Sequence, residues 1–464
     1  MATKSTQQSG PLSSTLKMSE QEQHPSNHQP PAFGTLEMKK QFYTDLNYTN
    51  LNHGSFGSTP KQVLQANFNY QVEMETSIDE WFRIKVIPKY NQSRQILSKM
   101  IGSQHEDDVV LVENASTAIN SIFRSYPFLN EMKQHMEKSQ NVDHTITLKK
   151  PITILYFNTA YGMVKKTLEF IHDFYGQVQL LELNFTLSDI QSEENILNKV
   201  QSFTLSHLNT HDIKIAVMCH IVSTPAITLP VRELVKLFKK HSISTIIDGA
   251  HTIGNIPFNV SEIDSDYYLT NTHKWLFTPK TGCLLWKNPK ASFQIHPTVI
   301  SFHYTNTPQS SYQKEFSYTG TRDYSSYLSI KDAIEYRQWL GGEEKIQHYN
   351  SQLAIQIGEL YSKLFGTQVI TNDKRLWGGS MVNIKLPLEF GEDLTFWTRV
   401  QSIVLETFRS YVVFYEFDSK MYCRISAQIY NDLNDYERIG RAIYQVAKEL
   451  KESDGGQVNS GGQE

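Results

Sequence analysis

Short apolar runs that alternate with helical segments constrain the fold of this chain more than any other feature. The runs occupy 108–112, 152–157, 178–183, 214–221, 244–248, 266–270 and 282–286. Helical periodicity fills the intervals, as in the segment after Pro230, where apolar residues recur at positions 231, 234, 235 and 238. Strands that are apolar throughout and separated by helices predict an α/β fold, with a mostly parallel, seven-stranded sheet covered on both faces.

The chain divides into two predicted domains and two polar ends. Its 464 residues exceed the size of one ordinary core. Residues 1–32, rich in Gln, Ser, Pro and Asn, and residues 453–464 are predicted to be disordered tails, because they have too little apolar surface to bury. Between them we predict an N-terminal arm at 33–60, a large domain at 61–305 and a smaller α+β C-terminal domain at 306–452.

Composition excludes several classes of protein. The net charge is -4 and the basic residues are scattered, so the chain carries no nucleic-acid footprint and no polybasic membrane patch. No apolar run has the length of a membrane span, and the first residues lack an apolar signal core. Cys219, Cys283 and Cys423 form no C-x-x-C pair, and no clustered metal-ligand motif is present. We therefore expect a cytoplasmic protein with buried free thiols, without a metal, a nucleic-acid partner or a membrane partner.

Polar residues follow several of the apolar runs. Asn114, Ser223, Asp248 and Asn271 lie at or just after the expected strand ends, where parallel sheets gather their ligands. Lys274 follows Asp248 by 26 positions, just beyond the next run. Pyridoxal phosphate chemistry requires such a pair: the lysine amine forms a Schiff base with the cofactor aldehyde, and the aspartate keeps the pyridine nitrogen protonated so that the ring accepts electrons. Taken singly, each of these residues fits an ordinary turn equally well.

The order of six short segments resembles the class V aminotransferase family of pyridoxal phosphate enzymes, which has fold type I. The resemblance runs from about residue 33 to 450 and is nearest to the branch of isopenicillin-N-epimerase-like and cysteine-desulfhydrase-like proteins. The segments that carry it are LNHGSFG at 51–57, NASTAIN at 114–120, DGAH at 248–251, NTHKW at 271–275, YTGT at 318–321 and RIS at 424–426.

The resemblance implies a role for each cofactor-binding position. Lys274 is expected to bind the cofactor and then to move the proton at Cα, and Asp248 to pair with the pyridine nitrogen. The tyrosine Tyr161 is expected to stack on the cofactor ring, with an ordinary core tyrosine as the alternative. The remaining positions fall into two groups. Near the cofactor phosphate we expect Ser116, Thr117, Asn271, His273 and, from the second subunit of a homodimer, Thr321. Near the phenolic oxygen of the cofactor we expect Ser223 and His251.

The same resemblance implies three substrate-binding residues. Arg424 is expected to hold the substrate carboxylate, because a planar guanidinium matches a carboxylate in two prongs. Asn52 and His53 are expected to line the entrance. For His53 the alternative is a purely structural turn, made by the glycines at 54 and 57.

The resemblance, which is strongest to desulfhydrase-like and sulfoxide-lyase-like members of the family, implies carbon–sulfur β-elimination from cysteine or an S-substituted cysteine, a small amino-acid substrate. Cys423 is the only cysteine beyond residue 286 and lies in an apolar run, which argues against a mobile persulfide-forming cysteine. Epimerisation and transamination by the same family remain alternatives, because fold and cofactor do not fix the reaction. A non-catalytic protein that binds the cofactor is the alternative of another class, and the presence of both Lys274 and Asp248 argues against it.

Overall fold

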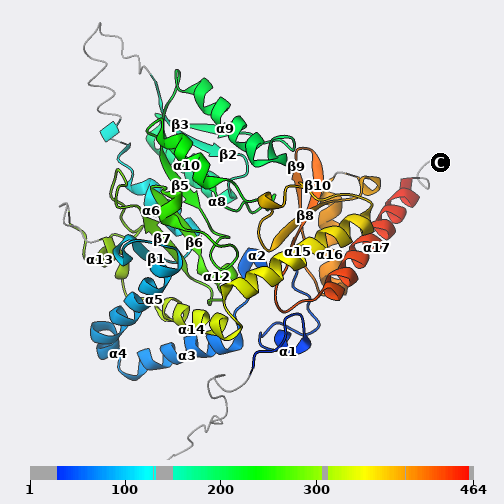
Figure 1. Ribbon diagram of the computed structural model, residues 1–464, viewed down its shortest axis with the longest axis horizontal. Coiled ribbons are helices and arrows are strands. Elements are labelled where there is room, and N and C mark those ends of the chain that lie inside the picture. Colours follow the sequence, from blue (N-terminus) through cyan, green and yellow to red (C-terminus); the bar gives the residue numbers. More distant parts are fainter. Residues whose placement is uncertain (1–28, 129, 132–149, 306–311, 392, 459–464) are drawn as a thin grey trace, which may run out of the picture.

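The computed structural model describes residues 29–128, 130–131, 150–305, 312–391 and 393–458. The expected N-terminal tail therefore lies almost entirely outside the described residues. Two sheets organise the rest of the chain (Figure 1). The large sheet has the strand order β1-β7-β6-β5-β4-β2-β3, and the small sheet has the order β8-β10-β9.

The large sheet contains the seven strands that the apolar runs predicted. Its strands are β1 (Val109–Val112), β2 (Ile152–Phe157), β3 (Val178–Leu183), β4 (Asp212–Cys219), β5 (Ser244–Asp248), β6 (Tyr267–Asn271) and β7 (Cys283–Lys287). The pairs β2–β3, β2–β4, β4–β5 and β5–β6 are parallel, whereas β7 runs antiparallel to both β1 and β6. The carboxyl ends of β4, β5 and β6 therefore meet at one edge of the sheet, which positions the residues that follow them.

Helices cover both faces of this sheet. The longer ones are α3 (Lys61–Thr76), α5 (Val86–Met100), α6 (Ala115–Ser125), α8 (Gly162–Tyr175), α9 (Glu193–His207), α10 (Val231–Lys239) and α14 (Ser325–Trp339). This part of the chain also contains the shorter helices α1 (Leu36–Lys39), α2 (His53–Phe56), α4 (Ile78–Glu80), α11 (Val260–Ile263), α12 (Thr272–Trp275) and α13 (Tyr312–Ser317), a π-helical turn at Trp81–Lys85, and 3₁₀ turns at Glu106–Asp108 and Asp189–Gln191.

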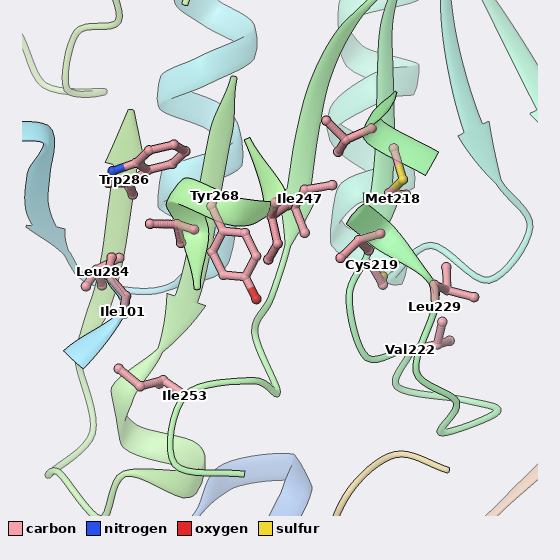
Figure 2. Close-up of a cluster of buried hydrophobic side chains, with 14 of the residues drawn as sticks. Ile101, Met218, Cys219, Val222, Leu229, Ile247, Ile253, Tyr268, Leu284 and Trp286 are labelled. Carbon is pink, nitrogen blue, oxygen red and sulfur yellow. The ribbon is translucent and has the colours of Figure 1, made fainter. Parts of the chain in front are cut away.

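Alternate residues of each strand enter different cores, because successive side chains of a strand point to opposite faces. In β1, Val109 and Leu111 join a cluster with residues of α5, α9, α10 and α14. Val110 and Val112 join the cluster on the other face, which contains residues of α6, α8 and α13. Figure 2 shows part of the first cluster, with Tyr268 and Trp286 beside the aliphatic side chains of neighbouring strands. Burial on both faces explains why these strands read as continuous apolar runs.

The C-terminal part forms a second core around the small antiparallel sheet. Its elements are α15 (Glu343–Phe365), β8 (Met381–Lys385), α16 (Leu394–Phe408), β9 (Val413–Phe417), β10 (Lys420–Ser426) and α17 (Leu433–Val458), with 3₁₀ turns at Lys374–Leu376 and Leu388–Phe390. The N-terminal arm crosses to this part, where Leu51 joins the buried cluster and its carbonyl accepts a hydrogen bond from Ser426 N at 2.8 Å.

Packing places two boundaries differently from the sequence expectation. Helix α14 follows the expected boundary at 305, yet it packs against α3 and α5, as Figure 1 also shows. Its Leu328 and Ile330 belong to the core of the large sheet, so the large domain continues to about residue 340. At the other end, α17 extends to Val458, past the expected start of the tail at 453. Arg399 on α16 pairs with Asp454 at 2.8 Å, a contact across neighbouring helices that local composition does not reveal.

Among the described residues, no helix combines the length and apolar character needed to cross a bilayer.

Candidate active site

A cavity of about 190 Å³ opens at the carboxyl ends of β4, β5 and β6, beside the N-terminus of α6. Eight residues expected at the cofactor site line it together. They are Ser116, Tyr161, Ser223, Asp248, His251, Asn271, His273 and Lys274. These residues come from five separate segments of the chain, and the strand order of the large sheet brings them to one edge.

Lys274 places a buried amine in this cavity. Its Nζ lies 3.0 Å from His251 Nε2, and Lys274 belongs to the short helix α12 that directly follows β6. Burial lowers the pKa of Lys274 to about 8, against the opposing attraction of the Asp248 carboxylate. An amine with this pKa has a much larger unprotonated fraction at neutral pH than an ordinary lysine, although most of it still carries its proton there. The unprotonated form is the one that attacks an aldehyde.

Asp248 places a buried carboxylate at the end of β5. Its Oδ1 accepts a hydrogen bond from Ala250 N at 3.0 Å, and only 4% of its surface is exposed. Burial raises its pKa, against the opposing effects of the Ala250 amide and of Lys274. Among the ion pairs of the described residues none includes Asp248, so the carboxylate faces the cavity without a cationic partner in contact. Such a group favours a ligand that brings a positive charge to it.

The N-terminus of α6 forms another wall of the cavity. Asn114 caps the helix by accepting from Thr117 N at 2.9 Å, and Asn271 Oδ1 accepts from Ala115 N at 2.9 Å. Ser116 lines the cavity at the same turn. A helix N-terminus of this kind attracts phosphate through its free amides and its dipole. His273 donates from Nδ1 to Gly282 O at 3.0 Å, and burial lowers its pKa to about 4.

Arg424 lies fully buried next to the cavity on β10. Its Nη1 donates to Ser223 Oγ and Ser223 O, both at 3.0 Å, while Nη2 donates to Asn52 Oδ1 at 2.6 Å and Ser55 Oγ at 2.7 Å. Its Nε–H has no hydrogen-bond partner among the described residues. Burial lowers the pKa of Arg424 to about 10. A buried guanidinium with an unused donor and no paired carboxylate favours an anionic ligand.

Tyr161 lies at the mouth of the cavity rather than in the core. About half of its side chain is exposed, at 51%. It precedes α8 and follows β2, so its ring stands beside the strand ends. The alternative of an ordinary core tyrosine is therefore wrong.

His53 lies elsewhere than the sequence led us to expect. It is completely buried and does not line the cavity. Its Nε2 donates to Lys274 O at 2.8 Å, and its Nδ1 accepts from Tyr430 OH at 2.9 Å. Burial lowers its pKa to about 3. The structural alternative therefore describes His53 better than the substrate entrance does, because the ring holds the backbone of Lys274 from behind.

Besides His53, Arg424 and three other expected residues lie outside the cavity wall. Asn52 contacts Arg424, whose guanidinium donates to the side-chain oxygen of Asn52. Thr117 turns its amide and its hydroxyl to Asn114 Oδ1, so it belongs to the helix cap. Thr321 is exposed and contacts Tyr318 OH at 3.5 Å, away from the cavity of its own chain.

Sequence reasoning missed several residues of the wall. Ser55 and Phe56 line the cavity from α2, and Cys219 lines it at the end of β4. Cys219 is the register partner of Asp248, so the rule that singled out strand ends could have found it. Ser55 lies inside the 51–57 segment that carried the resemblance, but the contact with Arg424 spans 369 positions and leaves no local signal. The described residues contain no cluster of ligands that could hold a metal ion.

Comparison with known proteins identifies the family of the chain. The family model for aminotransferase class V matches residues 177–439, and the chain belongs to this family of pyridoxal phosphate enzymes. The predictions of the family, the fold and the cofactor are confirmed.

Individual relatives span almost the whole chain. An L-cysteine desulfhydrase of Arabidopsis thaliana is 29% identical over 423 residues, covering 86% of this chain and 88% of the relative. A hercynylcysteine sulfoxide lyase of Schizosaccharomyces pombe is 29% identical over 416 residues, covering 88% and 96%. The isopenicillin N epimerase of Streptomyces clavuligerus is 24% identical over 421 residues, covering 88% and 97%.

Solved structures share the fold at low identity. The cystine C-S lyase C-DES, in complex with its product cysteine persulfide, matches with a TM-score of 0.66 and 17% identity, covering 86% of this chain and 97% of the other. An apo cysteine desulfurase from Thermococcus onnurineus matches with a TM-score of 0.69 and 15% identity, covering 91% and 100%.

Proposed function

We propose that the protein is a pyridoxal-phosphate-dependent carbon–sulfur β-lyase that acts on cysteine or an S-substituted cysteine. The observation that carries the proposal is that Lys274 and Asp248 face one cavity, one as a buried amine of lowered pKa and the other as a buried carboxylate without a cationic partner. The names of the desulfhydrase and sulfoxide lyase relatives support the substrate class.

The residues of the cavity fit the cofactor. Asp248 is suited to hold the protonated pyridine nitrogen, because that nitrogen supplies the positive charge that the carboxylate lacks. The N-terminus of α6 with Ser116, Asn271 and His273 would hold the phosphate, and Tyr161 would lie against the ring. When bound, pyridoxal phosphate supplies an electron sink that makes the Cα proton of an attached amino acid acidic.

Arg424 is suited to hold the α-carboxylate of the substrate. The side chains of Asn52, Ser55 and Ser223 fix its guanidinium at three points, and its buried Nε–H has no hydrogen-bond partner among the described residues. Anchoring the carboxylate orients the Cα–H bond, which decides which bond of Cα breaks.

Lys274 then moves the proton. Its amine, freed when the substrate binds, removes the proton from Cα as a general base. Electrons from the C–H bond form a Cα–Cβ double bond, and the Cβ–S bond breaks with the sulfur group leaving as a thiolate that takes up a proton. The three-carbon enamine that remains is hydrolysed. For cysteine the balance is cysteine and water giving pyruvate, ammonia and hydrogen sulfide.

The cysteines support release of sulfur as a free group rather than its capture by the protein. All three cysteines of the chain are buried and unpaired. Burial raises the pKa of Cys423 to about 12 and raises that of Cys219, although Cys219 lines the cavity. A thiol held in its protonated form is a poor nucleophile, so none of the three is suited to accept sulfur from the substrate.

The test is a visible spectrum of the purified enzyme before and after addition of L-cysteine, with sulfide, pyruvate and ammonia assayed in the same sample. A cofactor band that changes, with the three products in equal amounts, supports the proposal. S-substituted cysteine sulfoxides are compared under the same conditions. A keto acid without ammonia would indicate transamination, and a D-amino acid would indicate epimerisation; either result overturns the lyase proposal.

Lys274→Ala is the matched variant. We expect it to fold, because the change removes an amine whose burial is unfavourable, and to lose turnover by several orders of magnitude. Retention of the cofactor band and of full activity in this variant would show that Lys274 is not the cofactor lysine.

We further propose that the enzyme is a homodimer. Exposed apolar side chains gather on α3 and the turn after it, with exposed fractions of 51% for Phe68, 49% for Val72 and 56% for Ile78. Phe68 and Val72 line a cleft together with Asp323, two residues from Thr321. A second copy that covers this surface would bring Thr321 to the cavity of its partner, which accounts for its position outside its own cavity.

Sedimentation of two variants tests the homodimer. Phe68→Asp places a charge in the proposed interface and is expected to yield monomers with greatly reduced activity. Leu388→Asp is the control, because Leu388 is also an exposed apolar residue but lies in the C-terminal domain. A Phe68→Asp protein that sediments like the Leu388→Asp protein would contradict this surface as the interface.

We place the enzyme in the cytoplasm on the basis of its three free thiols, which a reducing compartment maintains. A relative in Arabidopsis thaliana is named chloroplastic, so an organelle is the alternative, and cell fractionation distinguishes the two.

A further inference from the structure

Trp275 directly follows Lys274 in the sequence, and its indole lies beside the imidazole of His251. It is almost completely buried and its Nε1 donates to His251 Nδ1 at 3.3 Å. The opposite nitrogen of the same imidazole, Nε2, lies 3.0 Å from Lys274 Nζ. His251 therefore stands between the indole N–H and the amine of the site, with one ring nitrogen turned to each.

The indole is held in one orientation. The His53 ring lies 5.0 Å from it, centroid to centroid. Gly54 leaves room for it, because a Cβ at that position would come within 3.1 Å of the indole. Ile221, Ala226 and Met381 complete the buried cluster around Trp275. The N–H group of Trp275 therefore has a fixed direction, toward His251.

Donor and acceptor chemistry then fixes the proton of His251. An indole N–H only donates, so His251 Nδ1 must be bare in order to accept it. A neutral imidazole with a bare Nδ1 carries its proton on Nε2, the nitrogen that faces Lys274. We propose that Trp275 is a positioning residue that locks His251 in the tautomer with the proton on Nε2, so that His251 presents a donor, never an acceptor, to the reactive amine.

The charge state of His251 agrees with this arrangement. Burial lowers the pKa of His251 well below its usual value, and the positive charges of Lys274 and Arg424 lower it further, so the imidazole is neutral. The inference rests on the proposed function in one respect, which is that Lys274 is the amine that binds the cofactor.

The proton on His251 Nε2 favours the unprotonated form of the Lys274 amine. An ammonium group has only donors, so it cannot bond to an imidazole N–H; a free amine offers a lone pair that accepts it. The lock therefore favours the free amine, the form that reacts with the cofactor aldehyde. The other titratable or charged groups that act on this amine are Asp248, Arg424, Cys219 and Cys283. A substitution at Trp275 leaves all four of these groups in the chain, so it isolates the effect of the tautomer.

The experiment measures how fast the full-length apoprotein recombines with pyridoxal phosphate, followed by the visible absorbance as a function of pH. The rate rises with the fraction of free Lys274 amine, so the midpoint of the pH–rate profile reports the pKa of that amine. Trp275→Phe keeps an aromatic ring but removes the N–H, and both tautomers of His251 become available. We expect its midpoint to rise by about one pH unit, which corresponds to about a tenfold lower rate below the midpoint.

Two controls separate a tautomer effect from loss of packing. Trp397→Phe also removes a buried indole N–H, which donates to Gly391 O at 3.2 Å in the C-terminal domain, and is expected to leave the midpoint unchanged. The second control, His251→Gln, introduces a side chain with its donor and its acceptor on separate atoms and without tautomers. In that background Trp275→Phe should produce no further shift of the midpoint.

The outcomes are distinct. An unchanged midpoint in Trp275→Phe, or an equal shift in the His251→Gln background, overturns the lock. Neutron diffraction of the unsubstituted holoenzyme needs no variant: a deuterium on His251 Nε2 supports the proposal, and one on Nδ1 refutes it. If the protein fails to bind pyridoxal phosphate at all, the proposed function fails, whereas the position of the deuterium in the apoprotein still decides the tautomer.

Discussion

Gly57 offers the sharpest test of how the backbone of Lys274 is held. The glycine ends α2 with φ 69° and ψ 174°, a conformation that other residues adopt only under strain. A Cβ at this position would lie 2.7 Å from Lys274 O and closer still to His273 O. Substitution by alanine therefore forces two successive carbonyl groups of α12 to retreat, and these are the groups that set the position of the Lys274 side chain.

The expected cost has two parts. Backbone strain lowers the free energy of unfolding by roughly 1–3 kcal/mol. Displacement of the His273–Lys274 peptides by up to about 1 Å lowers the rate of turnover by roughly 100-fold. Gly342→Ala separates the loss of stability from the loss of turnover. Gly342 has nearly the same conformation as Gly57, with φ 88° and ψ 177°, but a Cβ there would meet nothing within 4 Å.

The assay compares Gly57→Ala with Gly342→Ala by chemical denaturation, cofactor absorbance and steady-state kinetics. Both variants are expected to lose similar stability from backbone strain, and only Gly57→Ala is expected to lose turnover. Equal kcat in the two variants, with the cofactor band intact in both, would refute the argument that the close approach of Gly57 positions Lys274.

Three further predictions concern side chains. Asp248→Asn removes the charge that pairs with the pyridine nitrogen and is expected to lower kcat by about 10- to 100-fold, while circular dichroism shows an unchanged fold; an unaltered kcat would contradict the role of Asp248. Arg424→Lys loses the planar fork, so kcat/KM for L-cysteine should fall by about 10- to 100-fold, mainly through KM; a change confined to kcat would contradict carboxylate binding. Burial lowers the pKa of His220 to about 4 and that of His53 to about 3, so both are neutral in the fold and gain a proton on unfolding below pH 6.5. Stability should therefore decrease as the pH falls from 6.5 toward 4, by about 1.4 kcal/mol per pH unit for each histidine. Urea denaturation at a series of pH values measures this dependence. In His220→Gln the free energy of unfolding should change with pH by about 1.4 kcal/mol per pH unit less than in the unsubstituted protein. An unchanged dependence would show that His220 is protonated in the native state.

The sequence alone predicted the elements whose signal is local. The seven strands of the large sheet read as apolar runs because helices bury both of their faces, and the paired motifs around Asp248 and Lys274 lie where two neighbouring strands end. The fold class followed from these features, whereas the family and its cofactor followed from the resemblance that six short segments carry. The resemblance also supplied Ser223 and His251, which the structure places on the cavity wall.

Only the tertiary structure decided which side chains share a surface. Nothing near His53 in the sequence shows that its ring turns away from the cavity to hold Lys274 O, 221 positions away. The same holds for α14, which the sequence expectation placed in the C-terminal domain and which its packing on α3 and α5 assigned to the large domain.

The division has one physical reason. Secondary structure and strand ends follow from the periodicity of burial along the chain, which neighbouring residues record. A buried polar group needs a hydrogen-bond partner, because burial without one is costly. That partner often belongs to a distant segment of the chain, which only the fold brings close. The sequence therefore determined that Lys274 and Asp248 meet at one edge of a sheet, and the packing of Trp275, His251 and His53 decided how the lysine is held there.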